Sequence, residues 1–389
     1  MDWHDTPAQA SWRTDVREFL KTEFPRELAG FNTYITRPTR DGAWQRWREA
    51  LAKRGWIAAA WPKEYGGGGL SPLEQFILNE EFAEARAPQL GGSGTMMLGP
   101  TLIAHGTEDQ KKQHLGAILR DEVQWCQGYS EPGSGSDLAS LQTRAVRDGD
   151  DFVLNGQKIW TSGAHTADWM FCLARTDPDA PKHRGITYLL FDMKSPGITV
   201  RPLVNMAGAH HFNEVFFEDV RVPVKHAVGD INRGWYVGAT TLDFERSSIG
   251  SAVGMRQAVE ENLKWMRANK AGMAPTDYES AKTMWTERWV EAGVAQLLSY
   301  RIISMQSAGK IPNSEASISK LFSTELSQRV ARTAMKMLGM RGPLRESWVP
   351  FEGRVGDRYL ESVPATIAGG TSEIQRNIIA TRGLGLPRG

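Results

Sequence analysis

Two short stretches carry side chains that could hold a flat or phosphorylated ligand. The first, residues 131–137 (EPGSGSD), is rich in glycine and serine, so its backbone can approach a ligand closely and present N–H groups. The second, residues 160–162 (WTS), places an indole ring beside two hydroxyl groups. Alone, a loop of this composition usually just connects two elements. What favours a binding site is the segment that joins the two stretches.

This joining segment predicts a β-hairpin. Asp148-Gly149-Asp150 is typical of a tight turn, and residues 152–154 (FVL) are typical of a strand. Asn155-Gly156 is then predicted to be a type I′ hairpin turn, with residues 158–160 (KIW) as the return strand. The glycine-rich loop and the end of this hairpin would form two walls of one site.

The elements that must position these walls change type twice along the chain. Residues 11–121 have a helical pattern, clearest in 72–88, where apolar residues recur at helical spacing. Short β-branched or aromatic runs follow, at 169–173, 186–191, 198–200 and 215–217. They predict a small antiparallel barrel or sandwich. Beyond residue 234 the pattern is helical again, with long proline-free segments at 281–308 and 315–338.

We therefore predict an α+β multidomain fold with three parts. These are an N-terminal helical domain (1–121), a central antiparallel β-barrel or sandwich (122–232) and a C-terminal helical bundle domain (233–389).

Composition excludes several classes of function. The 389 residues have a formal net charge of +1, which favours neither nucleic acid nor an anionic membrane as a partner. Neither Cys126 nor Cys172 belongs to a CxxC or Cys/His cluster, so we expect no metal site and no disulfide framework. No secretory signal and no membrane-spanning run is visible, and a soluble cytoplasmic protein is expected.

Residues 129–162 closely resemble the flavin-binding segment of the acyl-CoA dehydrogenase family. That pattern runs Thr-Glu-Pro-x-x-Gly-Ser-Asp and later Asn-Gly-x-Lys-x-Trp, and here Ser130 replaces the threonine but keeps its hydroxyl. Other family segments follow in the family's order: GW at 55–56, WPKEYGG at 61–67, FFEDVRVP at 216–223 and GTSEIQR at 370–376. The chain is therefore identified as a member of this family. The resemblance implies the family's fold, with a four-helix bundle in the C-terminal domain.

The resemblance also implies a reaction, a cofactor and a set of site residues. The family oxidises an acyl-CoA thioester to the trans-2-enoyl-CoA: a carboxylate takes the α proton, and hydride passes from the β carbon to N5 of FAD. Carried over position by position, the FAD-binding residues are Gln127, Tyr129, Ser130, Gly135, Ser136, Trp160, Thr161, Ser162, Thr371, Ser372 and Glu373. The substrate-binding residues are Ser136, Asp243, Arg246 and Gly370. Glu131 and Asp137 are expected to be turn residues that cap their own loop.

The sequence departs from the commonest family pattern at the catalytic base. Most members carry a glutamate directly before the Gly-Thr motif, where this chain has Gly369. Glycine cannot accept a proton, although its backbone N–H can still stabilise a developing oxyanion. A minority branch places the base in an Asp/Leu-x-Glu-Arg context, which residues 242–246 (LDFER) match. A glutamate before an arginine on a helix is usually a solvated surface residue. The family comparison nevertheless makes Glu245 the predicted base.

A second departure concerns assembly. In homotetrameric members, an Arg-x-x-Phe-Gly segment with a downstream Gln, and a Gln-x-x-Gly-Gly turn, grip the adenosine half of a neighbour's FAD. The corresponding stretches here are 268–272 (ANKAG), Glu279 and 336–340 (KMLGM), which lack those residues, although Arg267 and Lys270 lie close in sequence. We therefore predict the catalytic chain of an α2β2 heterotetramer with a second acyl-CoA dehydrogenase-like chain. The endings AGGTSEIQR and GLPR resemble those of bacterial enzymes that act on sterol side chains. A homotetramer with a remodelled adenosine pocket is the alternative.

Two other functions stay open on the same fold. One is a flavin-dependent oxidase or monooxygenase, in which oxygen replaces the electron-transfer flavoprotein as the acceptor. The other is a non-catalytic subunit of a heteromeric dehydrogenase. The acyl group also stays open between steroid side-chain, dicarboxylic, branched and straight-chain CoA esters.

Overall fold

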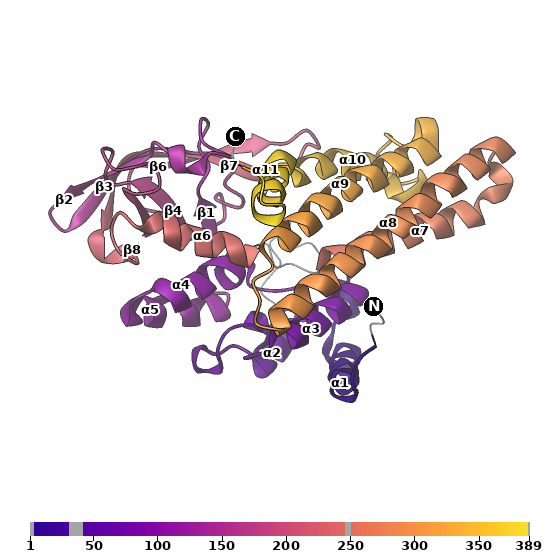
Figure 1. Cartoon of the computed structure of the whole chain (residues 1–389), viewed down its shortest axis with the longest axis horizontal. Helices are drawn as coiled ribbons and strands as arrows, with labels where there is room; N and C mark the ends of the chain where they lie inside the picture. Colours follow the sequence, from indigo (N-terminus) through magenta and orange to yellow (C-terminus); the bar gives the residue numbers. More distant parts are fainter. Residues whose placement is uncertain (1–3, 31–41, 246–249, 388–389) are drawn as a thin grey trace. The chain divides into compact units, whose positions relative to one another are not determined.

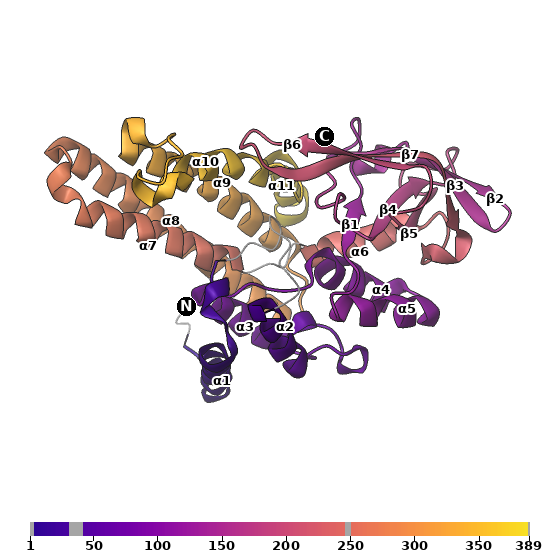
Figure 2. The same cartoon turned by 180° about the vertical axis from the view of Figure 1, so that it is seen from behind.

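The computed structural model describes residues 4–30, 42–245 and 250–387. By its internal contacts the chain divides into two compact units (Figures 1 and 2). The first, which we call the bundle unit, comprises residues 1–17, 71–85 and 246–389. The second, the sheet unit, comprises residues 18–70 and 86–245. Each unit therefore contains segments that are distant in sequence.

The bundle unit is built from helices whose apolar faces pack against one another. Its helices are α3 (Pro72–Glu84), α7 (Gly250–Ala268), α8 (Pro275–Ser307), α9 (Asn313–Leu338), α10 (Arg354–Ala365), α11 (Ser372–Ile378) and the first part of α1 (Pro7–Glu23). Helices α7, α8, α9 and α10 pack around a core that includes Trp285, Leu326 and Val259, all completely buried. The Trp285 indole N–H points at the Met337 sulfur, 3.1 Å away. This arrangement confirms the predicted helical C-terminal region.

Helix α3 illustrates how local sequence sets an element's limits. Ser71 caps it through a capping box with Glu74, and Pro72 occupies the first turn, where a missing N–H costs nothing. Phe76 and Ile77 bury their side chains against Ile303 of α8. The sequence pattern predicted that this segment ends at Pro88. The helix ends earlier, at Glu84, because the chain turns at Arg86, which has a φ of 54°.

The sheet unit combines helices with an eight-stranded sheet. The helices are α2 (Gly42–Arg54), α4 (Gly99–His105), α5 (Glu108–Leu119), α6 (Gly234–Glu245) and the remainder of α1. The strands are β1 (Trp125–Gly128), β2 (Arg144–Asp148), β3 (Asp151–Lys158), β4 (Trp169–Arg175), β5 (Ile186–Asp192), β6 (Ile198–Val204), β7 (His210–Pro223) and β8 (Ala227–Val228).

The sheet has two ends rather than closing into a barrel. Its order is β6-β7-β3-β2-β4-β5-β8, with β1 paired to β4. Pairing is antiparallel except at β1–β4 and β2–β4, which are parallel. Along the chain, helices precede a β-sheet domain and further helices follow it. This order confirms the predicted fold class, with a sandwich rather than a barrel in the centre.

Strand β4 faces a separate apolar core on each side. Phe171 and Leu173 join a core with residues of α4, α5 and α6, whereas Met170 and Cys172 join one with β3 and β7. This alternation follows from the two-residue period of a strand. Both cysteines are free and buried. Burial raises the pKa of both thiols, so they behave as small apolar side chains.

The predicted turn at Asn155-Gly156 is wrong. Strand β3 includes both residues, and the hairpin turn lies earlier, between Asp148 and Asp151. Gly156 instead occupies a bulge with a φ of 150°, where an added Cβ would lie 2.7 Å from the Thr143 Cα. An Asn-Gly pair favours a turn locally, but the glycine here serves a close approach of two backbones.

A buried histidine between α5 and the sheet makes stability depend on pH. The His114 ring lies edge-on to Trp125 and Trp169, at 5.2 and 5.1 Å between ring centroids. Its Nε2 has no hydrogen-bond partner in the described part of the chain. Burial, and then the charge of His226, lowers the pKa of His114 to about 4.

We expect this histidine to weaken the fold as the pH falls. In the unfolded chain His114 is protonated below its ordinary pKa, near 6.5. In the folded chain it is protonated only below about pH 4. The unfolding free energy should therefore drop by up to about 3 kcal/mol between pH 6.5 and 4. Urea denaturation of His114→Phe, which keeps an aromatic ring, should show a shallower pH slope. His183→Phe, at an exposed position, should keep the wild-type slope; an unchanged slope in His114→Phe would refute the assignment.

None of the described helices is long and apolar enough to cross a membrane. Within the same ranges, no three or more His, Cys, Asp or Glu side chains are grouped so that they could hold a metal ion.

Candidate functional site

A buried ion pair ties the two predicted walls together. Lys158, at the end of β3, is completely buried, and its Nζ lies 2.7 Å from Oε1 of Glu131, which is 8% exposed. The same ammonium donates to the Tyr129 carbonyl at 3.0 Å. Glu131 also accepts from the backbone N–H groups of Gln142 and Thr143, at 2.6 and 2.9 Å. It therefore does more than the sequence indicated: it holds a neighbouring segment and a lysine 27 residues away.

The surroundings of Glu131 keep it charged. Burial alone would raise the pKa of this carboxyl, but the Lys158 ammonium and the hydrogen bonds to it hold the pKa below its usual value. The charged, hydrogen-bonded pair of Glu131 and Lys158 therefore fixes residues 129–131, which follow β1, against the end of β3.

The glycine-rich loop beyond Glu131 is short and internally bonded. Glu131 and Ser134 exchange backbone hydrogen bonds at 2.9 and 3.0 Å, and the Ser134 hydroxyl donates to the Asp137 carbonyl at 2.9 Å. Gly135 and Ser136, both predicted site residues, are exposed at its tip. Asp137 forms an ion pair with Lys182. The loop is thus preformed and presents its tip outward.

The second wall presents an indole at the end of β3. Trp160 has a φ of 60° and leaves its side chain 59% exposed, with its ring edge-on to Phe212 at 5.9 Å. Thr161 is buried, and Ser162 is exposed. A tryptophan in the left-handed region is strained, so the surrounding structure must hold it there.

Helix α6, which ends at Glu245, packs against β5 and β4 and lies close to Tyr129, the residue after β1. A Cβ added to Gly238 would lie 3.2 Å from Cδ1 of Leu173 and 3.4 Å from the Tyr129 hydroxyl, so a side chain there would crowd Leu173. The Thr241 hydroxyl meets the hydroxyls of Thr101 and Tyr188, at 2.8 and 3.5 Å. Residues four or seven positions apart lie on the same face of an α-helix. Position 245 is four residues after 241 and seven after 238, so it lies on the face of α6 that carries them, about 10 Å along the axis from Gly238.

Three predicted residues at the end of α6 are only partly described. Asp243 and Glu245 belong to the last turn of the helix. Arg246 lies outside the described residues.

The predicted residues near the C-terminus form a turn in the bundle unit. Gly369 and Gly370 have φ angles of 62° and 89°, which few other residues adopt. Thr371 caps α11 by accepting from the Ile374 N–H at 3.2 Å. Lys320 donates to the Gly370 carbonyl at 2.7 Å.

The remaining two predicted residues of this turn differ in exposure. Ser372 is buried, and its hydroxyl has no partner among the described residues. Glu373 is exposed, and hydrogen bonds from its own backbone and from Thr371 lower its pKa.

The segments that correspond to the family's adenosine grip make contacts within the bundle unit. Lys270 lies over the Tyr278 ring at 5.0 Å, and Glu279 pairs with Lys282 at 3.1 Å. Arg267 is exposed in the last turn of α7. Lys270 is therefore engaged within its own unit.

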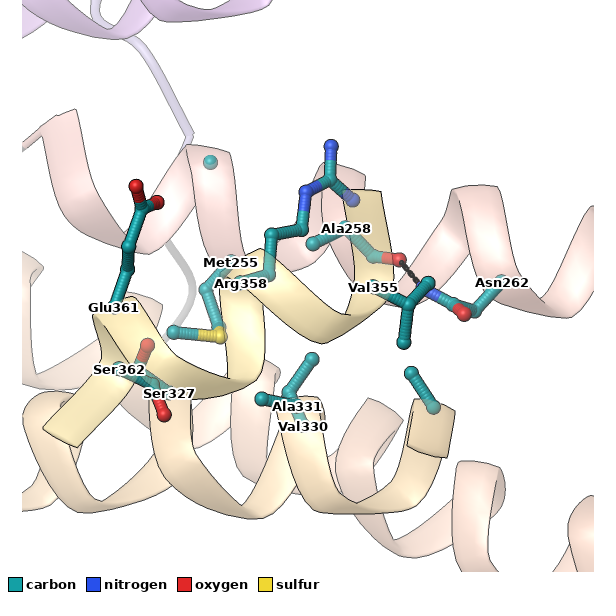
Figure 3. Close-up of a pocket in the computed structure, with 12 residues that line it drawn as sticks. Met255, Ala258, Asn262, Ser327, Val330, Ala331, Val355, Arg358, Glu361 and Ser362 are labelled. Atoms are coloured by element: carbon teal, nitrogen blue, oxygen red, sulfur yellow. Dashed lines mark hydrogen bonds between the residues drawn. The ribbon is translucent and has the colours of Figure 1, made fainter. Parts of the chain in front are cut away.

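Two hollows lie in different units. One, of about 510 Å³, adjoins the glycine-rich loop and is lined by Glu131, Pro132, Gly133, Ser134, Ser140, Gln142, Thr143, Gly156 and Gln157. The other, of about 360 Å³, lies among α7, α9 and α10 (Figure 3). Its walls include Met255, Asn262 and Arg358, and it contains none of the predicted site residues. The loop hollow is not lined by a predicted site residue either, but it adjoins the loop that carries Gly135 and Ser136.

The residues of the sheet unit fit a flavin. A broad planar ring needs an apolar surface and scattered hydrogen-bonding groups, and Trp160 offers an exposed indole beside them. The Thr161 hydroxyl and the Gln127 amide nitrogen are buried with no hydrogen-bond partner among the described residues. Buried polar atoms without partners are costly unless something else bonds to them, and a ligand ring with carbonyls and ring nitrogens can do so.

One residue bonded to this wall, Asn213, was not among those predicted from the sequence. Asn213 of β7 is completely buried and bonds to both sides of Thr161. A signal existed: Asn213 occupies an inward strand position in register with the buried Val215 and Phe217, where a polar side chain is unexpected.

Comparison with known proteins gives consistent matches along the chain. Family models match residues 6–122 (acyl-CoA dehydrogenase, N-terminal domain), 126–220 (middle domain) and 232–384 (C-terminal domain). The acyl-CoA dehydrogenase IpdE1 of Mycobacterium tuberculosis is 39% identical over 350 residues, which is 88% of each protein.

Solved structures agree with these matches. The Tcur3481-Tcur3483 steroid ACAD superposes with a TM-score of 0.85 at 34% identity, covering 100% of both chains. The ChsE4-ChsE5 complex from Mycobacterium tuberculosis superposes with a TM-score of 0.82 at 36% identity, again over 100% of both chains.

Proposed function

Because this chain belongs to the acyl-CoA dehydrogenase family, we propose that it catalyses the FAD-dependent α,β-dehydrogenation of an acyl-CoA thioester to the trans-2-enoyl-CoA, with Glu245 as the base. The observation that carries the proposal is the phase of helix α6. Gly238 and Thr241 face the sheet beside Tyr129 and Tyr188, and position 245 continues that face. The candidate base thus belongs to the same unit as the Trp160 wall.

Each proposed group has a distinct task. Bound FAD supplies the hydride acceptor, at N5. The Glu245 carboxylate takes the α proton, and its basicity rises once substrate excludes water. A backbone N–H at Gly369 or Gly370 stabilises the developing charge on the thioester oxygen.

The remaining residues hold the two ligands. Residues 127–136 and 160–162 bind the flavin, and residues 371–373 meet its diphosphate. Ser136, Asp243 and Arg246 contact the pantetheine and thioester part of the substrate.

Among acyl groups, we propose a steroid side chain as the first to test. The support is that a matched structure of equal length is a steroid ACAD. Purified holoenzyme should lose its flavin absorbance anaerobically when a suitable CoA ester is added, and should turn over with ferrocenium as acceptor. Straight, branched and dicarboxylic esters complete the panel. No bleaching with any ester would indicate a non-catalytic subunit, and rapid reoxidation of the product complex by air would indicate an oxidase.

We further propose that the chain works in an α2β2 heterotetramer with a second acyl-CoA dehydrogenase-like chain, with an electron-transfer flavoprotein as acceptor. Support comes from the missing adenosine-grip residues and from two matched structures whose names pair different chains. Expressed alone, the chain should carry well under one FAD per subunit, measured by absorbance after size-exclusion chromatography with light scattering. Full occupancy in a homotetramer would refute this assembly.

A further inference from the structure

Asn213 bonds to both the backbone N–H and the backbone carbonyl of Thr161. The Asn213 carbonyl accepts from the Thr161 N–H at 3.1 Å, and the Asn213 side-chain Nδ2 donates to the Thr161 carbonyl at 3.0 Å. The Asn213 side chain thus donates to the Thr161 carbonyl the hydrogen bond that the backbone N–H of a neighbouring strand would donate in a regular sheet. The preceding residue, Phe212, contacts Trp160 edge-on at 5.9 Å. Adjacent residues of β7 therefore support adjacent residues of the predicted flavin wall.

Two histidines lock the orientation of this amide. The Thr161 carbonyl can only accept, so the Asn213 nitrogen must face it and the Asn213 oxygen must face away. That oxygen lies 2.8 Å from His210 Nε2, which must therefore carry a hydrogen. The amide nitrogen also lies 3.1 Å from His165 Nδ1, which must therefore accept and carry none. The two imidazoles stack at 4.1 Å between centroids.

We propose that Asn213, held by His165 and His210, is a positioning residue that fixes Thr161 and with it the Trp160–Ser162 wall, so that flavin binding responds to protonation of His165. This inference rests on the proposed FAD site. Its basis is the juxtaposition of one buried amide, two histidines and the peptide group of Thr161.

Protonation of His165 would break the network as it stands. An imidazolium carries a hydrogen on Nδ1 and cannot accept from the Asn213 nitrogen. Turning the amide over would point its oxygen at the Thr161 carbonyl, which is repulsive. Partial burial, and then the charges of His210 and His211 on β7, lower the pKa of His165, and they outweigh the hydrogen bond with Asn213, which raises it. The network is therefore intact at neutral and alkaline pH and weakens in acid.

The test measures FAD release from holoenzyme by the fluorescence of free FAD, at several pH values between 5 and 8. Wild type should bind FAD about fivefold to tenfold more weakly at pH 5 than at pH 8. Asn213→Ala should bind about tenfold more weakly at pH 8, with little further change in acid. Asn213→Asp should also be weak at pH 8, because a carboxylate cannot donate to Thr161. It should approach wild type as the pH falls, because a protonated acid regains one donor.

Further variants separate positioning from general damage. His165→Phe keeps a ring for stacking but has no Nδ1, so it should flatten the pH dependence even if the Asn213 variants fold poorly. Asn155→Ala is the matched control. It removes another asparagine side chain that bonds to backbone, here the N–H of Asp219, and it should leave FAD binding and its pH profile unchanged. The inference is overturned if wild type holds FAD while the Asn213 and His165 variants keep its affinity and pH profile within twofold. Failure of wild type to bind FAD even when FAD is added in excess would instead refute the proposed function.

Discussion

Glu245→Gln is expected to lose turnover by about 10² to 10⁴-fold while FAD stays bound. Glutamine has nearly the shape of glutamate but cannot take the α proton. The measurement is the rate of anaerobic flavin bleaching by the best CoA ester of the panel, in a single turnover, so that product release does not limit it. Bound FAD is checked by absorbance in the same sample.

Two comparisons make this result specific to position 245. Glu245→Asp keeps a carboxylate but shortens its reach, so its rate should lie between wild type and glutamine. Glu64→Gln, an exposed glutamate in the turn Lys63–Tyr65, should bleach at the wild-type rate. A Glu245→Gln rate within a few-fold of wild type would mean that another group is the base.

Lys158→Met is expected to destabilise the sheet unit by about 3–5 kcal/mol, since it leaves the buried Glu131 carboxylate without its cation. The methionine fills similar volume, so the loss comes from the charge rather than from a cavity. Because the same ammonium holds the Tyr129 carbonyl, the variant should also release FAD more easily. Urea denaturation followed by tryptophan fluorescence measures the stability change.

A double variant tests whether charge is the cause. Glu131→Gln alone leaves a buried ammonium and should be about as damaging as Lys158→Met. Combining the two removes both charges, so the double variant should be more stable than either single variant. Glu122→Gln, which breaks an exposed pair with Arg120, should barely move the midpoint. Additive losses in the double variant would refute the pairing argument.

Ion pair and amide network act on the same short wall from opposite ends. Lys158 secures the strand before Trp160, and Asn213 secures the residue after it. An exposed tryptophan in a strained backbone conformation needs both, since nothing in its own neighbourhood along the chain favours that conformation. We expect the flavin site to be sensitive to residues that never touch flavin.

The sequence by itself determined the order of element types, the four predicted β runs and the family membership. Strand and helix periods are local properties, and motif spacing along one chain needs no knowledge of contacts. Local signals also explain the failure at Asn155-Gly156, where a turn-forming pair lies inside a strand because Thr143 approaches from a neighbouring segment.

Only the tertiary structure decided what surrounds each candidate residue. Thr161 and Asn213 are 52 residues apart, and Lys158 and Glu131 are 27 apart, so no local rule relates them. Likewise, the sequence indicated a glutamate at position 245, but which face of α6 it extends follows from Gly238 and Thr241 packing against the sheet. Burial and long-range pairing depend on how distant segments meet, and that is settled only when the chain has folded.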